Sequence, residues 1–92
     1  DEGTPVRAIA AGRVVYANWL SGFGNLIIVD HGAKYLSVYA YNQSVLRRVG
    51  DVVSAGDVIA KVGATGGQVE SGLYFEIRHQ GAPVNPLLWL KR

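Results

Sequence analysis

Residues 49–63 read VGDVVSAGDVIAKVG, and a Gly-Asp pair occurs there at Gly50 and again at Gly56, each time before a short apolar run. Such a pair can turn the chain ahead of a strand, because glycine adopts positive φ and aspartate bonds nearby backbone groups. We therefore expect two short strands in this stretch. Gly50, Gly56 and Gly63 should sit at turns, some of them at positive φ.

The flanking sequence has the same character, with short apolar runs separated by glycine. Further strands are expected over residues 5–10, 12–19, 25–31, 35–41 and 73–78. A loop or a single helical turn is expected over 42–49, and a polar, glycine-rich loop over 64–71. No stretch keeps the apolar spacing of an amphipathic helix. The sequence thus predicts an all-β fold, a compact antiparallel β-sheet domain with many short strands and glycine turns.

Alternation along the expected strands assigns side chains to the two faces of the sheet. In 73–78, the residues expected to face the core are Leu73, Phe75 and Ile77, and those expected to face away are Tyr74, Glu76 and Arg78. In 35–41, the residues expected to share one face are Tyr35, Ser37, Tyr39 and Tyr41. In 12–19, Val14 and Tyr16 are expected to share a face.

Length and composition limit the classes of protein. At 92 residues, 49% hydrophobic and 17% charged, the chain has the make-up of one folded domain covering residues 1–92. No apolar run approaches the ~20 residues that span a bilayer. A net charge of +2 from scattered residues argues against a nucleic-acid partner. We also expect the domain to be a monomer. The absence of cysteine excludes disulfides, thiolate nucleophiles and cysteine-based zinc sites.

An ordered series of short motifs runs through nearly the whole chain. In chain order, they are Gly3-Thr4-Pro5-Val6-Arg7-Ala8, Gly12-Arg13-Val14-Val15, Gly22-Phe23-Gly24-Asn25, Asp30-His31-Gly32, Gly50-Asp51-Val52-Val53, Gly63-Ala64-Thr65-Gly66, Phe75-Glu76-Ile77-Arg78 and Val84-Asn85-Pro86. This series resembles the LytM/lysostaphin-type zinc peptidase domain (duplicated hybrid motif). The resemblance implies a compact antiparallel β-domain whose open groove normally holds zinc. Active members of that family cut peptide bridges of peptidoglycan.

The residues that bind zinc or assist catalysis in active members of the family are replaced here. The His-x-His pair before Phe-Glu reads Gly72-Leu73-Tyr74, and the Tyr-x-His of an earlier strand reads Tyr39-Ala40-Tyr41. Neutral tyrosine, with a pKa of about 10, is a poor zinc ligand and a poor base at neutral pH. The degenerate positions are therefore Tyr41, Gly72 and Tyr74. We expect no zinc or other cofactor, no metal ligand and no catalytic residue.

Among degenerate members, the chain resembles the EnvC-type murein hydrolase activators of Gram-negative bacteria. The residues that carry this resemblance are Trp19-Leu20 before Ser21-Gly22-Phe23-Gly24, Tyr39-Ala40-Tyr41-Asn42-Gln43-Ser44, Leu73-Tyr74-Phe75-Glu76-Ile77-Arg78 and Asn85-Pro86-Leu87-Leu88-Trp89-Leu90. The resemblance implies a periplasmic domain at the division septum that cuts nothing itself. It would activate an N-acetylmuramoyl-L-alanine amidase during daughter-cell separation, with peptidoglycan as a further partner. The NlpD-type activators are a second resemblance.

Other parts of such activators are expected outside this chain. The family's remaining His-x-x-x-Asp pair, its first strand and an upstream coiled coil would all precede Gly3. A membrane division complex would be reached only through those upstream regions.

The candidate partner-binding groove consists of Leu26, Tyr39, Tyr41, Tyr74, Glu76 and Arg78. Tyrosine and arginine are enriched at interface hot spots, and a partner helix with an apolar stripe and one acidic group would suit them. Without the resemblance, alternating tyrosines are typical of a solvated sheet face, and Glu76 with Arg78 of a surface ion pair worth ~0–1 kcal/mol. His31 is expected to be a structural residue at a strand end.

Two other functions stay open from the residues alone. An active zinc endopeptidase of the same fold is disfavoured by the missing imidazoles. A biotinyl- or lipoyl-type carrier domain would need a modifiable lysine at a hairpin tip. Lys34 is expected in a turn, but its Gly-Ala-Lys-Tyr surroundings do not resemble an attachment site. A non-catalytic activator is therefore the function that we expect.

Overall fold

The computed structural model describes residues 3–63 and 73–84, and these residues form β-strands and turns without a helix. The strands are β1 (Pro5–Arg7), β2 (Gly12–Leu20), β3 (Gly24–Gly32), β4 (Tyr35–Val45), β5 (Val52–Val53), β6 (Val58–Val62), β7 (Tyr74–His79) and β8 (Ala82–Val84). All their pairings are antiparallel. The predicted antiparallel all-β fold is confirmed. No helix in the described ranges could cross a membrane.

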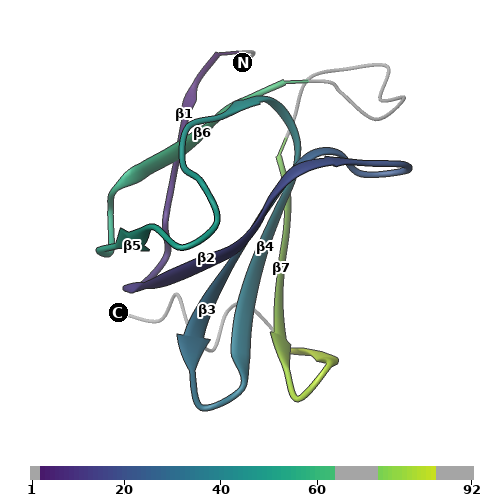
Figure 1. The fold of residues 1–92 in the computed structure, drawn as a ribbon. Helices are drawn as coiled ribbons and strands as arrows, with labels where there is room; N and C mark the ends of the chain where they lie inside the picture. The colour runs from purple at the N-terminus through teal and green to yellow at the C-terminus, as the bar shows by residue number, and fades with distance from the viewer. Residues whose placement is uncertain (1–2, 64–72, 85–92) are drawn as a thin grey trace.

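Strand β4 is the centre of the sheet. The strands follow the order β1-β6-β4-β3-β2-β5, and β7 pairs with β4 and with β8. One side of β4 pairs with β3, whereas its other side pairs with β7 over residues 35–40 and with β6 over residues 42–45. In Figure 1, β2, β3, β4 and β7 run alongside one another, while β6 and β1 diverge from them. The main core lies where β1, β5 and β6 fold against this sheet.

Two expected strand boundaries are wrong. The strand expected over residues 5–10 is β1, which ends at Arg7. Residues 42–49 were expected to be a loop or a helical turn, but β4 continues to Val45, with Asn42 opposite Val62 and Val45 opposite Ala60. The polar sequence that favours a loop includes Asn42, whose side chain is fully buried and finds backbone partners inside the sheet. The loop expected over 64–71 lies outside the described residues.

The three glycines of residues 49–63 are required for two different reasons. Gly50 and Gly56 have φ of 98° and 89°, as the Gly-Asp pairs predicted. The following aspartates cap these turns, since Asp51 accepts a 2.9 Å hydrogen bond from the Arg48 N–H and Asp57 a 2.8 Å bond from the Ser54 N–H. Gly63 does not have positive φ. It is required because a Cβ there would collide with the backbone of Gln43.

A β-bulge corrects the expected faces of β2. Val14 pairs with Val29 and Tyr16 with Ile28, so Val15 is an extra residue on β2. Val14 therefore points into the main core, while Tyr16 packs on the opposite side of the sheet. The expectation that Val14 and Tyr16 share a face is wrong, because a bulge shifts the alternation by one residue.

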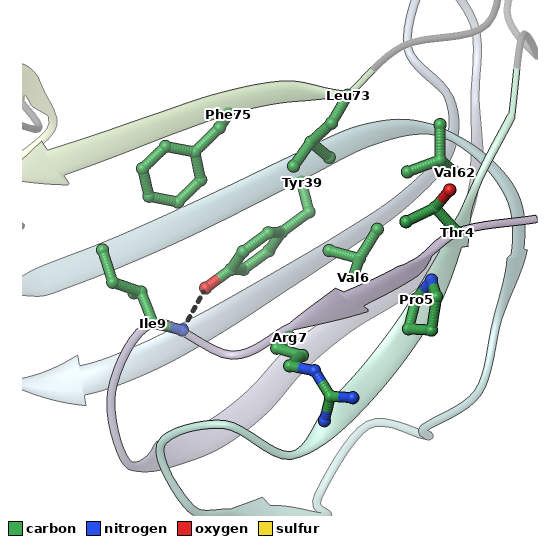
Figure 2. A pocket seen from close by; sticks show the side chains of 9 residues that line it. All are labelled: Thr4, Pro5, Val6, Arg7, Ile9, Tyr39, Val62, Leu73 and Phe75. Carbon is green, nitrogen blue, oxygen red and sulfur yellow. Dashed lines mark hydrogen bonds between the residues drawn. The ribbon is translucent and has the colours of Figure 1, made fainter. Parts of the chain in front are cut away.

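Tyr39 is a core residue. It is 1% exposed, its ring centroid lies 5.4 Å from that of Phe75, and its hydroxyl accepts a 3.1 Å hydrogen bond from the Ile9 N–H. Figure 2 shows Tyr39 among the side chains that line an apolar pocket between β1, β6 and the β4–β7 pair. The volume of this pocket is about 550 Å³. The expectation that Tyr39 lies on the same face as Tyr74 is wrong, because Tyr39 points to the inner side of the sheet.

Alanine at the three glycines should lower stability. At Gly50 and Gly56 the surroundings are open, so positive φ alone should cost on the order of 1 kcal/mol or more in unfolding free energy. Gly63→Ala should cost more, because the obstructing atoms are backbone atoms. Urea unfolding measures each variant, with Ser21→Ala at an exposed position as the control. Parent-like midpoints for all three glycine variants would contradict the assignment.

The buried hydroxyl of Tyr39 should make stability depend on alkaline pH. Burial raises the pKa of Tyr39 above 10.0, although hydrogen bonds with Ser37 and from the Ile9 N–H lower it. Because the folded-state pKa is the higher one, this contribution to stability is complete below pH 10 and is lost as the pH rises through the folded-state pKa.

Tyr39→Phe should lower the free energy of unfolding by about 1 kcal/mol at neutral pH, because it leaves the Ile9 N–H without its acceptor. Its stability should then fall less steeply than the parent's above pH 10. Urea unfolding of both proteins at neutral and at alkaline pH gives the slope of unfolding free energy against pH for each. Equal slopes would show that Tyr39 does not titrate in this way.

Candidate functional site

The outward side chains of β7 meet those of β2, β3 and β4 on the face of the sheet opposite Tyr39. Ala40 pairs with Tyr74, and Val38 pairs with Glu76. A second buried cluster underlies this surface. We call the surface the tyrosine face, and its members are Tyr16, Leu26, Ile28, Val38, Ala40, Tyr41, Tyr74, Glu76 and Arg78.

The tyrosine face brings together five of the six residues predicted for the groove. These are Leu26, Tyr41, Tyr74, Glu76 and Arg78. Leu26 is 3% exposed and so forms part of the floor, whereas Tyr74 is 38% exposed. Tyr39 is excluded, because it points to the other face. Gly72, predicted as a degenerate metal position, lies outside the described residues. A partner-binding role for this face stays a prediction.

Tyr41 reaches the tyrosine face through a bulge in β4. Between their paired residues, β3 has only Leu26, whereas β4 has both Ala40 and Tyr41. Tyr41 has a φ of 63°, in the left-handed region that residues with a Cβ rarely adopt. Such a conformation costs on the order of 1–3 kcal/mol and persists only where neighbouring contacts enforce it. The extra residue separates Tyr41 from Tyr39 and turns its ring toward Tyr74.

Tyr74 lies at the centre of an aromatic group. Its ring centroid is 5.9 Å from that of Tyr41, with the rings edge to face, and 6.2 Å from that of Phe23. Its hydroxyl donates a 3.2 Å hydrogen bond to Glu76 Oε1. Partial burial raises the pKa of Tyr74, and the charge of Glu76 raises it further, while Arg78 acts in the opposite direction. Tyr74 is therefore a neutral hydroxyl donor at ordinary pH.

Glu76 links Tyr74 to Arg78. Arg78 Nη2 lies 3.2 Å from Glu76 Oε2, and Arg78 Nη1 donates a 2.9 Å hydrogen bond to the Gly81 carbonyl. The side chain of Glu76 is 15% exposed and that of Arg78 is 40% exposed. An ion pair of this exposure contributes only ~0–1 kcal/mol to stability. Its main effect is to hold the guanidinium in one place beside the tyrosines.

Sequence reasoning missed two aromatic residues at this surface, Tyr16 within it and Phe23 beside it. Tyr16 was expected on the Val14 face, and the bulge that moves it leaves no sign in the sequence. Phe23 was assigned to a turn, yet its ring contacts Tyr74. Beside it in the β2–β3 hairpin, Trp19 is 54% exposed and Leu20 is 41% exposed. The available signal for Phe23 was an aromatic residue placed between Gly22 and Gly24 in a turn.

The described residues of the tyrosine face do not fit zinc. In the described ranges, no three His, Cys, Asp or Glu side chains gather where they could hold a metal ion. Glu76 is already engaged by Tyr74 and Arg78. His79 stacks on Tyr35, with ring centroids 4.1 Å apart. The donor set on this face is thus phenolic and cationic, which is suited to hydrogen bonding and not to a zinc-bound water.

His31 is held inside a hydrogen-bond network. Its Nδ1 lies 2.7 Å from the Ala11 carbonyl oxygen and its Nε2 lies 2.7 Å from Ser37 Oγ. Because a carbonyl oxygen only accepts, Nδ1 is the donor in the contact with Ala11. These contacts join β3 to the β1–β2 connection and match the structural role expected for His31.

Comparison with known proteins identifies the family. A sequence model of a protein family, described as peptidase family M23, matches residues 1–86. The chain is 56% identical to the murein hydrolase activator EnvC of Escherichia coli K12 over 92 residues, covering 100% of this chain and 22% of that protein. It is 51% identical to the lipoprotein NlpD of Yersinia enterocolitica over 91 residues, covering 98% of this chain and 93% of that protein.

Solved structures show the same fold. A peptidase M23 structure from Pseudomonas aeruginosa matches with a TM-score of 0.93 at 30% identity, over 97% of this chain and 39% of that chain. The catalytic domain of lysostaphin from Staphylococcus simulans matches with a TM-score of 0.90 at 31% identity, over 100% of this chain and 74% of that chain. The LytM/lysostaphin-type resemblance read from the motifs is confirmed. The chain belongs to peptidase family M23.

Proposed function

We propose that this domain is a non-catalytic binding module that activates a peptidoglycan hydrolase in the envelope of a Gram-negative bacterium. The hydrolase is a periplasmic N-acetylmuramoyl-L-alanine amidase, and the setting is septal splitting during cell division. Support comes from two murein hydrolase activators of Escherichia coli K12, EnvC at 56% identity and NlpD at 50%. The chain spans only 22% and 24% of their lengths, so roles of the whole protein are part of the proposal.

One observation carries the proposal: the packed Tyr41–Tyr74 pair lies beside the Glu76–Arg78 ion pair on an open sheet face. Tyrosine combines a large apolar ring with a polar end, and the arginine fork can grip a carboxylate through two hydrogen bonds. Tyr74 and Arg78 are both held by contacts within the domain before a partner binds, which lowers the side-chain entropy lost on association. An amidase segment with an apolar stripe and one carboxylate fits this face.

The same residues argue against the second candidate, a zinc endopeptidase like lysostaphin. Where active members place imidazoles, this sequence has Tyr41, Gly72 and Tyr74. A phenol cannot supply the neutral nitrogen ligand or the base that zinc hydrolysis uses near neutral pH. On this proposal the fold of the peptidase is kept as a scaffold, and its site has become a contact surface.

The purified domain should contain no stoichiometric zinc and should cleave no peptidoglycan by itself. The reason is the phenolic donor set at the former imidazole positions. Elemental analysis after dialysis and muropeptide release assays measure the two properties. Near-equimolar zinc, or cleavage that a chelator abolishes, would favour the endopeptidase instead.

Tyr74→Ala and Arg78→Ala should fold normally but lose amidase stimulation. Exposed substitutions usually change stability by less than ~0.5 kcal/mol. Truncating a tyrosine or arginine that a partner buries often costs about 2 kcal/mol, roughly a thirtyfold loss of affinity. Melting curves and dye-labelled peptidoglycan release, at domain concentrations below saturation, measure the two effects.

The control is Lys61→Ala, an exposed residue on β6 and away from the tyrosine face. Arg78→Lys separates charge from geometry, because it keeps the charge but loses the fork. It should retain only part of the stimulation if a carboxylate is gripped at two points. Full stimulation by both alanine variants would refute the role of this face.

A further inference from the structure

The conformation of Tyr41 has a specific support within the sheet. Asn42 is 0% exposed, and its Nδ2 donates to the Tyr39 carbonyl at 3.0 Å and to the Asn25 carbonyl at 2.8 Å. One amide group therefore joins the residue that precedes the bulge to the facing strand β3. Both bonds close around the bulge, where Ala40 and Tyr41 lie opposite the single residue Leu26.

Asn25 makes the reciprocal connection from β3. Its Nδ2 donates to the Asn42 carbonyl at 3.2 Å and to the Gln43 carbonyl at 3.1 Å. The two asparagines thus link the strands in both directions, and we call them the asparagine clasp. A bulge interrupts the regular backbone hydrogen bonds between two strands, and here side-chain amides donate to backbone carbonyls at that point.

The clasp also fixes the hairpin beside Tyr41. The Tyr41 N–H donates a 2.9 Å hydrogen bond to the Phe23 carbonyl, and Phe23 precedes the Gly24–Asn25 start of β3. The rings of Phe23 and Tyr41 both contact Tyr74, at centroid distances of 6.2 and 5.9 Å. Moving Asn25 or Asn42 would therefore disturb the two rings that flank Tyr74.

We infer that Asn25 and Asn42 are positioning residues for partner binding: the clasp holds Tyr41 in its left-handed conformation and so presents the Tyr41–Tyr74 pair to the amidase. Neither asparagine is assigned a direct contact with the partner. The inference rests on the proposed function, and it extends the site from the exposed tyrosines to a buried amide pair behind them.

The test compares Asn42→Ala with Ser37→Ala. Both positions lie on β4 and are 0% exposed, and both substitutions remove side-chain hydrogen bonds, but those of Ser37 go to His31 and Tyr39 on the inner face, before the bulge. Asn25→Ala is the milder second variant if Asn42→Ala does not fold, since Asn25 is only half-buried. Tyr41→Ala is measured alongside as the direct removal of the presented ring.

Two readouts separate positioning from stability. The intraresidue NOE between the amide and α protons of Tyr41 is strong only at positive φ, and it reports the conformation without any partner. Peptidoglycan release by a purified amidase reports function, measured well below the melting temperature of each variant. We expect both asparagine variants to weaken the NOE and to raise the half-maximal stimulating concentration about tenfold or more. Ser37→Ala should change neither, despite a lowered melting temperature.

Several outcomes would contradict the inference, and each can be told from a failure of the proposed function. The inference fails if the asparagine variants keep the NOE, if they stimulate like the parent while Tyr41→Ala does not, or if Ser37→Ala loses stimulation equally. Full stimulation by Tyr41→Ala would overturn both the inference and the assigned role of Tyr41. A parent domain that stimulates no amidase would instead refute the proposed function, whatever the NOE of Tyr41 shows.

Discussion

Strand β4 exchanges its outer partner from β7 to β6 at Tyr41, and the single extra residue of the bulge at this point shapes both faces of the sheet. Before the bulge, alternation directs Tyr39 inward, where β1 and β6 cover it. After the bulge, Tyr41 points outward beside Tyr74. A regular strand would have placed both rings on one face, so the core and the candidate site depend on the same local irregularity.

The strands, the glycine turns and the faces of β7 could be predicted because they follow from local sequence. The Gly-Asp pairs at Gly50 and Gly56 carry their own turn geometry, and the alternation of β7 is uninterrupted. The bulges at Val15 and Tyr41 could not be predicted, since they arise from unequal residue counts between paired strands. For the same reason Tyr39 was assigned to the site and Tyr16 was not.

The chemistry of the site follows from which side chains the scaffold presents. The fold is that of family M23 peptidases, yet the described outward residues around Tyr74 are phenols with a glutamate and an arginine. Glu76 is held by both neighbours, so its carboxylate already has two partners within this face. Such a surface is suited to recognising a protein segment, which is how we interpret its relation to the activators EnvC and NlpD.

The most direct test of this account is to add the domain to a purified periplasmic N-acetylmuramoyl-L-alanine amidase and to measure the release of dye-labelled peptidoglycan. The account predicts no release by the domain alone, weak release by the amidase alone and strong release by the mixture. It also predicts that dialysing the domain against a chelator before mixing leaves the activity of the mixture unchanged. Release by the domain alone, or a mixture no more active than the amidase, would contradict it.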